Sequence, residues 1–127
     1  MRQPIQPPGT KASSAPLSSA IDTGEFIYVS GQGALDPATG TYLKADVQSE
    51  TRQVFENIKT ILQAAGSSLD RVVKCNVYLR DINDFAAMNE VYKTYFSTPY
   101  PARTTIQAGA LPLGFAVEIE CIAGKGR

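Results

Sequence analysis

The fold is decided by residues 46–79, which read DVQSETRQVFENIKTILQAAGSSLDRVVKCNVYL. Apolar side chains recur at every third or fourth position from Val47 to Ala65, which predicts an amphipathic helix. Asp46 can cap the first turn of this helix, and Gly66 can end it in the left-handed conformation. The period then changes to two between Val72 and Leu79, as in a strand with one buried face. The side chains expected to share the buried face of this strand are Val73, Cys75, Val77 and Leu79.

The sequence on either side of this stretch predicts further strands and a second helix. Glu25 to Ser30 is rich in aromatic and β-branched residues, which is typical of a strand, and Gly31 to Gly33 should end it. The other expected elements are a second helix from Asp81 or Asn83 to about Phe96 and closing strands at 104–108 and 115–123. This order predicts an α+β sandwich, a mixed β-sheet with two helices packed on one face. The proline-rich residues 1–14 are expected to form an extended N-terminal arm, and residues 15–127 a single domain.

The composition excludes several classes of protein. Twelve basic and twelve acidic side chains in 127 residues give no net charge, which argues against a nucleic-acid or membrane-surface partner. No histidine is present, which excludes imidazole bases and histidine-ligated zinc. Cys75 and Cys121 fall on apolar alternation and are expected to be buried, unreactive thiols. Because neither a secretory signal nor ~18 consecutive apolar residues are found, the expected location is cytoplasmic.

The two closing strands carry the charged residues that suggest chemistry. Alternation groups Arg103 with Thr105 on one strand and Glu118 with Glu120 on the other. If the apolar residues face the helices, all four lie on the helix-free face of strands that we expect to be adjacent. A guanidinium binds a carboxylate through two parallel hydrogen bonds, and a glutamate can orient or deprotonate water. The pattern therefore predicts a site for a small carboxylate, with a cross-strand ion pair as the structural alternative.

Three further features have both a functional and a structural interpretation. The backbone amides around Gly31, which follows Ser30 at the end of a strand, could bind an anion, or the glycine could only turn the chain. Asn89 lies beside the apolar stripe of the second helix, where a polar surface contact is the simplest role. Helical spacing favours the core or a subunit interface for the aromatic cluster of Tyr92, Tyr95 and Phe96.

Short motifs run in order from about residue 15 to residue 123. The most specific are Tyr100-Pro101-Ala102-Arg103, Leu111-Pro112 and Val117-Glu118-Ile119-Glu120. The others include Ser30-Gly31-Gln32, Asp36-Pro37-Ala38-Thr39-Gly40, Thr51-Arg52-Gln53, Asp81-Ile82-Asn83-Asp84-Phe85 and Asn89-Glu90-Val91-Tyr92. In this order and spacing they resemble the RidA family, also called the YjgF or L-PSP family.

The resemblance implies a fold, an assembly and a reaction. The fold would be chorismate-mutase-like and assembled as a homotrimer, in which the helix-free sheet faces line an inner barrel and ligand clefts lie between neighbouring subunits. Members of the RidA type hydrolyse reactive 2-enamines and 2-imines, of the 2-aminoacrylate and 2-iminobutanoate kind, to 2-keto acids and ammonia. This chemistry needs no metal and no cofactor, because an imine is already electrophilic. Small 2-imino and 2-keto acids and further copies of the chain are therefore the expected partners.

The resemblance also gives roles to individual residues. Arg103 would clamp the substrate carboxylate, Gly31 would donate a backbone amide to it, and Glu118 would position the attacking water. The pocket would be lined by Ser30, Asn89, Thr105 and Leu17.

Departures from the family pattern bear on the function. Leu17 stands where a tyrosine is usual, Leu113 where a lysine is common, and Thr105 where many members have cysteine, serine or alanine. Loss of the tyrosine hydroxyl makes the pocket more apolar, which leaves a non-catalytic 2-keto acid-binding or chaperone-like trimer as an alternative. A second alternative is an endoribonuclease of the L-PSP type, against which the zero net charge and the absence of histidine argue.

Overall fold

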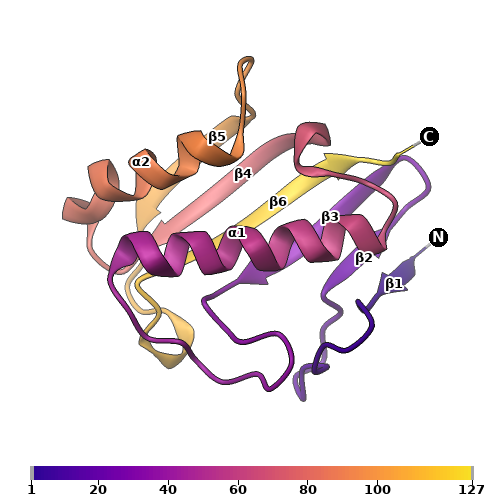
Figure 1. Ribbon diagram of the computed structural model, residues 1–127, viewed down its shortest axis with the longest axis horizontal. Coiled ribbons are helices and arrows are strands. Elements are labelled where there is room, and N and C mark those ends of the chain that lie inside the picture. Colours follow the sequence, from indigo (N-terminus) through magenta and orange to yellow (C-terminus); the bar gives the residue numbers. More distant parts are fainter. Residues whose placement is uncertain (1, 127) are drawn as a thin grey trace.

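A single six-stranded sheet, covered on one face by two helices, makes up the computed structural model, which describes residues 2–126 (Figure 1). The strand order is β1-β2-β3-β6-β4-β5. Neighbouring strands of the described chain are antiparallel except for β4 and β5, which are parallel. The sheet is therefore mixed, and the predicted α+β architecture with two helices on one face is confirmed. The strands are β1 (Gln3–Ile5), β2 (Ala20–Asp22), β3 (Phe26–Gln32), β4 (Val72–Leu79), β5 (Ala102–Gln107) and β6 (Val117–Gly124), and the helices are α1 (Val47–Ala64) and α2 (Phe85–Tyr95).

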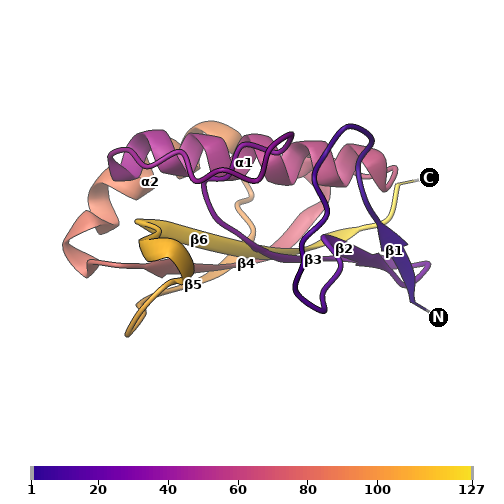
Figure 2. The same ribbon diagram turned by 90° about the horizontal axis from the view of Figure 1, so that it is seen from below.

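The predicted first helix is confirmed together with both of its ends. The Asp46 side chain accepts a hydrogen bond from the Ser49 amide at 2.8 Å and so caps the first turn of α1. Beyond its last turn the chain passes through Gly66, whose φ of 74° is the left-handed conformation that glycine adopts at least cost. Figure 2 shows α1 and α2 on the same side of the sheet. Side chains of α1 such as Phe55 and Leu62 are fully buried against the sheet. Burial of each such side chain stabilises the folded state by about 1.5–3 kcal/mol.

The second helix begins one short turn later than the sequence predicts. Asp81 caps a 3₁₀ turn at Ile82–Asp84, in which its side chain accepts a hydrogen bond from the Asn83 amide, and α2 follows directly. The three aromatic residues of the predicted cluster surround the Phe55 ring, with ring centroids 4.8–5.5 Å from it. The cluster therefore belongs to the core between the helices.

The strand β4 has the predicted bounds, but the predicted burial of the Val73 side chain is wrong. The pairing of β4 with β6 shifts between Val72 and Lys74, so Val72 is buried and Val73 is 49% exposed. Such a shift inserts one residue into the alternation, which a strict period of two does not allow for. Cys75 and Cys121 are free and buried, as predicted.

The N-terminal arm is more ordered than the prediction of an extended arm implies. Gln3–Ile5 within it forms β1, which pairs with β2 and extends the sheet at its edge. An edge strand needs hydrogen bonds on one side only, so Pro4 is tolerated there.

The strand β3 is longer than predicted. It continues through Gly31 to Gln32, with a register shift between Val29 and Gln32, rather than ending at Ser30.

The placement of Arg103 on the helix-free face is wrong, and so is the adjacency of the closing strands. β4 lies between β5 and β6. Arg103 and Thr105 pair with Cys75 and Val77 of β4, whose side chains are buried beneath the helices. The prediction failed because β5 is an edge strand with little apolar alternation, and its one large aliphatic side chain, Ile106, is 48% exposed.

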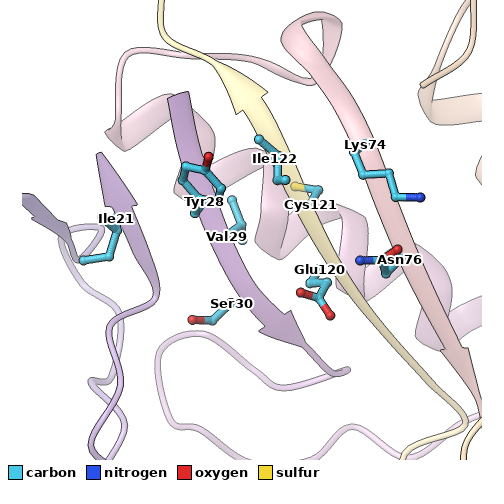
Figure 3. A pocket seen from close by; sticks show the side chains of 9 residues that line it. All are labelled: Ile21, Tyr28, Val29, Ser30, Lys74, Asn76, Glu120, Cys121 and Ile122. Carbon is cyan, nitrogen blue, oxygen red and sulfur yellow. The ribbon is translucent and has the colours of Figure 1, made fainter. Parts of the chain in front are cut away.

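The helix-free face of the sheet is partly apolar. Tyr28 and Ile106 are about half exposed there, and Glu118 and Glu120 lie on the same face. A hollow of about 240 Å³ on this face is lined by side chains that include Tyr28 and Glu120 (Figure 3). Among residues 2–126, no helix is long and apolar enough to cross a membrane.

Candidate functional site

A groove of about 800 Å³ brings several of the predicted site residues together. It lies between the N-terminal segment, the start of β6 and the loop that follows β3. Four of its lining residues are among those that the resemblance assigned to the pocket: Leu17, Ser30, Gly31 and Glu118. The groove is also lined by Leu113, which is 68% exposed and has a φ of 57° in the Pro112–Gly114 turn.

Glu118 is packed directly against the backbone of Gly31. A Cβ atom added to Gly31 would lie 2.3 Å from Glu118 Oε2, so glycine alone leaves room for the carboxylate. Burial, and secondarily the negative charge of Glu120, raise the pKa of Glu118 above its ordinary value. A carboxylate with a raised pKa that borders a groove has the properties of a general base.

The N-terminal segment is fixed at the groove by Ser30. Its hydroxyl donates a hydrogen bond to the Ser18 carbonyl oxygen at 2.6 Å, and its amide donates to the Ser19 carbonyl oxygen at 3.0 Å. Leu17 precedes these residues and is 56% exposed, with its side chain bordering the groove. The hydroxyl of Ser30 is therefore engaged in holding the segment that carries Leu17.

Arg103 lies in a second group of predicted residues, between β5 and α2. Its Nη1 donates a hydrogen bond to Asn89 Oδ1 at 2.7 Å. The guanidinium carbon lies 4.6 Å from the ring centroid of Tyr92 and 5.3 Å from that of Phe85, which are cation–π distances. Thr105 follows on the same face of β5, and its hydroxyl is buried without a hydrogen-bond partner in residues 2–126. The side chain of Arg103 is thus oriented by an amide and two rings, while its other N–H groups have no hydrogen-bond partner within residues 2–126.

The two groups do not meet within one chain. Glu118 is paired across the sheet with Tyr78 on the helix-free face, whereas Arg103 is paired with Cys75 on the face beneath the helices. Leu17, Ser30, Gly31 and Glu118 therefore form one group, and Asn89, Arg103 and Thr105 form the other.

Sequence reasoning missed two sets of contacts. The first is the hydrogen bond that the Tyr78 hydroxyl donates to Glu120, which requires knowing that β4 lies beside β6. The second is the stacking of Arg103 on Tyr92 and Phe85, which helical spacing predicts only to lie on the apolar stripe of the second helix. No local sequence signal identifies either set. Within the described range, no three histidine, cysteine or acidic side chains are grouped closely enough to hold a metal ion.

Comparisons with known proteins identify the family. The sequence profile of the family described as Endoribonuclease L-PSP matches residues 9–125. A RutC family protein of Pyrococcus horikoshii is 52% identical over 110 residues, which are 87% of each chain. The 2-iminobutanoate/2-iminopropanoate deaminase of Mus musculus is 47% identical over 119 residues, covering 92% of this chain and 88% of that protein. The crystal structure of E. coli TdcF with bound serine has a TM-score of 0.89 and 37% identity, covering 98% of this chain and 99% of that one. This chain therefore belongs to the RidA/YjgF/L-PSP family.

Proposed function

We propose that this protein hydrolyses reactive 2-enamines and 2-imines to 2-keto acids and ammonia. The observation that carries the proposal is the Glu118 carboxylate, which has a raised pKa and lies against the Gly31 backbone at a groove. The Mus musculus relative of this protein is named a 2-iminobutanoate/2-iminopropanoate deaminase, which supports the same substrate class here. The serine bound to TdcF is a small amino acid, which agrees in size and charge with such a ligand.

The chemistry follows from the electrophilic carbon of the imine. Glu118 accepts a proton from a water molecule as the water oxygen bonds to C2 of the protonated imine, which gives a tetrahedral 2-amino-2-hydroxy acid. The amino nitrogen then takes up the proton held by Glu118, the C2–N bond breaks to release ammonia, and the hydroxyl proton passes to solvent as the keto group forms. A 2-enamine reaches the same step after protonation at C3. Arg103 binds the substrate carboxylate through two hydrogen bonds, and the Gly31 N–H donates a further one. Ser30, Asn89, Thr105 and Leu17 line the pocket.

The proposed site needs two copies of the chain, because Glu118 and Arg103 lie on opposite faces of one sheet. We propose a homotrimer in which the helix-free faces line an inner barrel and Arg103 of one copy reaches Glu118 of the next. Covering the half-exposed Tyr28 and Ile106 would favour this association, because burial removes apolar surface from water. A cytoplasmic location stays a prediction.

Mixing two inactive variants tests both the reaction and the shared site. Arg103→Ala and Glu118→Gln should each lose most of the hydrolysis of 2-aminoacrylate generated in situ, measured as ammonia and keto acid. Trimers reassembled from equal amounts of the two should regain about a quarter of the wild-type activity, since each mixed ring contains one intact site in three. Glu90→Gln, on the exposed surface of α2, is the matched control and should keep full activity.

The results of this experiment separate the proposal from its alternatives. Mixed trimers with no recovered activity would disprove the shared site. Saturable binding of 2-ketobutyrate by a wild type that accelerates no hydrolysis would instead indicate the non-catalytic binding protein. The family description as an endoribonuclease keeps RNA cleavage as a second candidate. That activity would be supported by RNA cleavage that Arg103→Ala abolishes.

A further inference from the structure

Tyr78 and Glu120 form a polar pair beside Glu118 that the proposed reaction does not use. Tyr78 of β4 is the direct cross-strand partner of Glu118 of β6. Its hydroxyl reaches diagonally to Glu120, two residues further along β6, and donates a hydrogen bond to Glu120 Oε1 at 2.5 Å. The hydrogen bond raises the pKa of Tyr78, so the phenol remains a donor at neutral pH. Tyr78 is therefore the cross-strand neighbour of Glu118 and the hydrogen-bond donor to Glu120.

The hydrogen bond opposes a movement that Glu120 would otherwise make. Two carboxylates on the same face of a strand and two residues apart, roughly 6–7 Å, repel each other. Glu120 is only half-buried and could turn its charge into solvent. The Tyr78 hydroxyl instead keeps the Glu120 carboxylate on the sheet surface, where Figure 3 shows it beside Asn76 of β4.

We propose that Tyr78 and Glu120 are positioning residues: they hold a second negative charge next to Glu118 and thereby make it a stronger base. The inference rests on the proposed function, in which Glu118 takes the proton of the attacking water. A base with a higher pKa removes that proton faster, provided that the base is still ionised at the working pH. The charge of Glu120 acts in this direction, because it raises the pKa of Glu118.

Other charged groups near Glu118 do not replace this effect. The β3 residues that line the groove with Glu118 are the neutral Ser30, Gly31 and Gln32. Lys74 of β4 lines the hollow that contains Glu120, and its ammonium group donates a hydrogen bond to the Thr104 hydroxyl. Lys11 and Asp36 line the same groove with opposite charges, and neither of the two ion pairs in the described residues involves Glu118. In the proposed trimer, a second copy would add its Arg103, equally in every variant compared below.

The test measures the titration of Glu118 directly, by ¹³C NMR of the glutamate carboxyl groups in the substrate-free protein. Glu120→Gln should lower the midpoint of Glu118 by about 0.5–1 pH unit, the repulsion of two charges roughly 6–7 Å apart at an effective dielectric of about 40–80. Tyr78→Phe keeps the ring and should lower the midpoint of Glu118 by less than Glu120→Gln does. The double variant should match Glu120→Gln. Tyr28→Phe, on the same face of the sheet, is the matched control and should change nothing.

The pH profile of imine hydrolysis supplies the second measurement. Its acid limb should move to lower pH with the NMR midpoint, and the rate at neutral pH should fall about two- to three-fold in Glu120→Gln. An unchanged midpoint in Glu120→Gln would overturn the inference, as would a lower rate with an unmoved acid limb. If Glu120→Gln lowers the midpoint of Glu118 but the wild type hydrolyses no imine, the effect of Glu120 on Glu118 is supported and the proposed function is disproved.

Discussion

Replacing Gly31 by alanine should remove activity without unfolding the protein. The added Cβ would lie 2.3 Å from Glu118 Oε2 and 3.0 Å from its Cδ. These carboxyl atoms are the far end of a flexible side chain, so they can yield where a backbone could not. The backbone at Gly31 does not have the positive φ that disfavours alanine. The substitution therefore acts on the position of the Glu118 carboxylate rather than on the fold.

The size of the effect follows from the distance. An ordinary contact requires at least 3.4 Å, so Glu118 Oε2 must move by about 1.1 Å. A misplacement of about 1 Å at a reacting group can reduce the rate about 100-fold. The alanine keeps the backbone N–H that is proposed to bind the substrate carboxylate, so kcat should fall while KM changes little. Loss of glycine's freedom in the unfolded chain offsets the local strain, and the melting temperature should stay within a few degrees.

The assay is hydrolysis of 2-aminoacrylate, with the melting temperature and the mass of the assembly in solution recorded alongside. Gly109→Ala is the matched control, because nothing lies within 4 Å of a Cβ there, and it should keep full activity. If Gly31→Ala acts through Glu118, adding it to Glu118→Gln should cause no further loss. Near-wild-type kcat in Gly31→Ala, or a full additional loss in the double variant, would refute the reasoning.

Three further substitutions or conditions have definite expected outcomes. Arg103→Ala should lower kcat/KM of imine hydrolysis about 10- to 100-fold. Arg103→Lys should recover little of this activity, because an ammonium cannot form the planar two-fold contact. Full recovery by lysine would contradict the proposed binding of the substrate carboxylate by Arg103. The raised pKa of Glu118 requires the rate to fall as the pH is lowered through a value above 4.5, and a flat profile down to that pH would exclude it as the base. Glu50→Ala deprives three donors, including the Tyr42 hydroxyl, of a buried acceptor. Urea denaturation should show a loss of about 3 kcal/mol or more, against less than about 0.5 for the exposed Glu90→Ala.

The helix α1 and the strand β4 could be predicted from the sequence because burial follows one clear period along α1 and, in β4, from Cys75 to Leu79. Asp46 and Gly66 mark the ends of α1 by local chemistry, which needs no knowledge of the tertiary fold. Register shifts are different, because they arise from the fit between two strands. The exposure of Val73 and the continuation of β3 through Gly31 both accompany such shifts, and the sequence contains no signal for either.

The candidate site could be predicted only residue by residue. Motifs identified Glu118, Gly31, Arg103 and Asn89, and the structure places the first pair in contact and the second pair in a hydrogen bond. The grouping of these residues depends on strand order and on the face that each side chain occupies. Both are decided by which strands pair in the sheet, and a mostly polar edge strand such as β5 leaves its face undetermined in the sequence.

The face occupied by Arg103 has a consequence for assembly. With Arg103 on the helix-free face, as alternation suggested, a single chain could have held both the clamp and the base. In the structure Arg103 is oriented towards α2, where Asn89 and two aromatic rings hold it at the edge of the sheet. Glu118 lies two strands away on the opposite face. A substrate of three or four carbons cannot reach both from one chain, so if the proposed reaction uses both residues, activity must depend on association. Dilution below the dissociation constant of the proposed trimer should then abolish hydrolysis even though each chain stays folded.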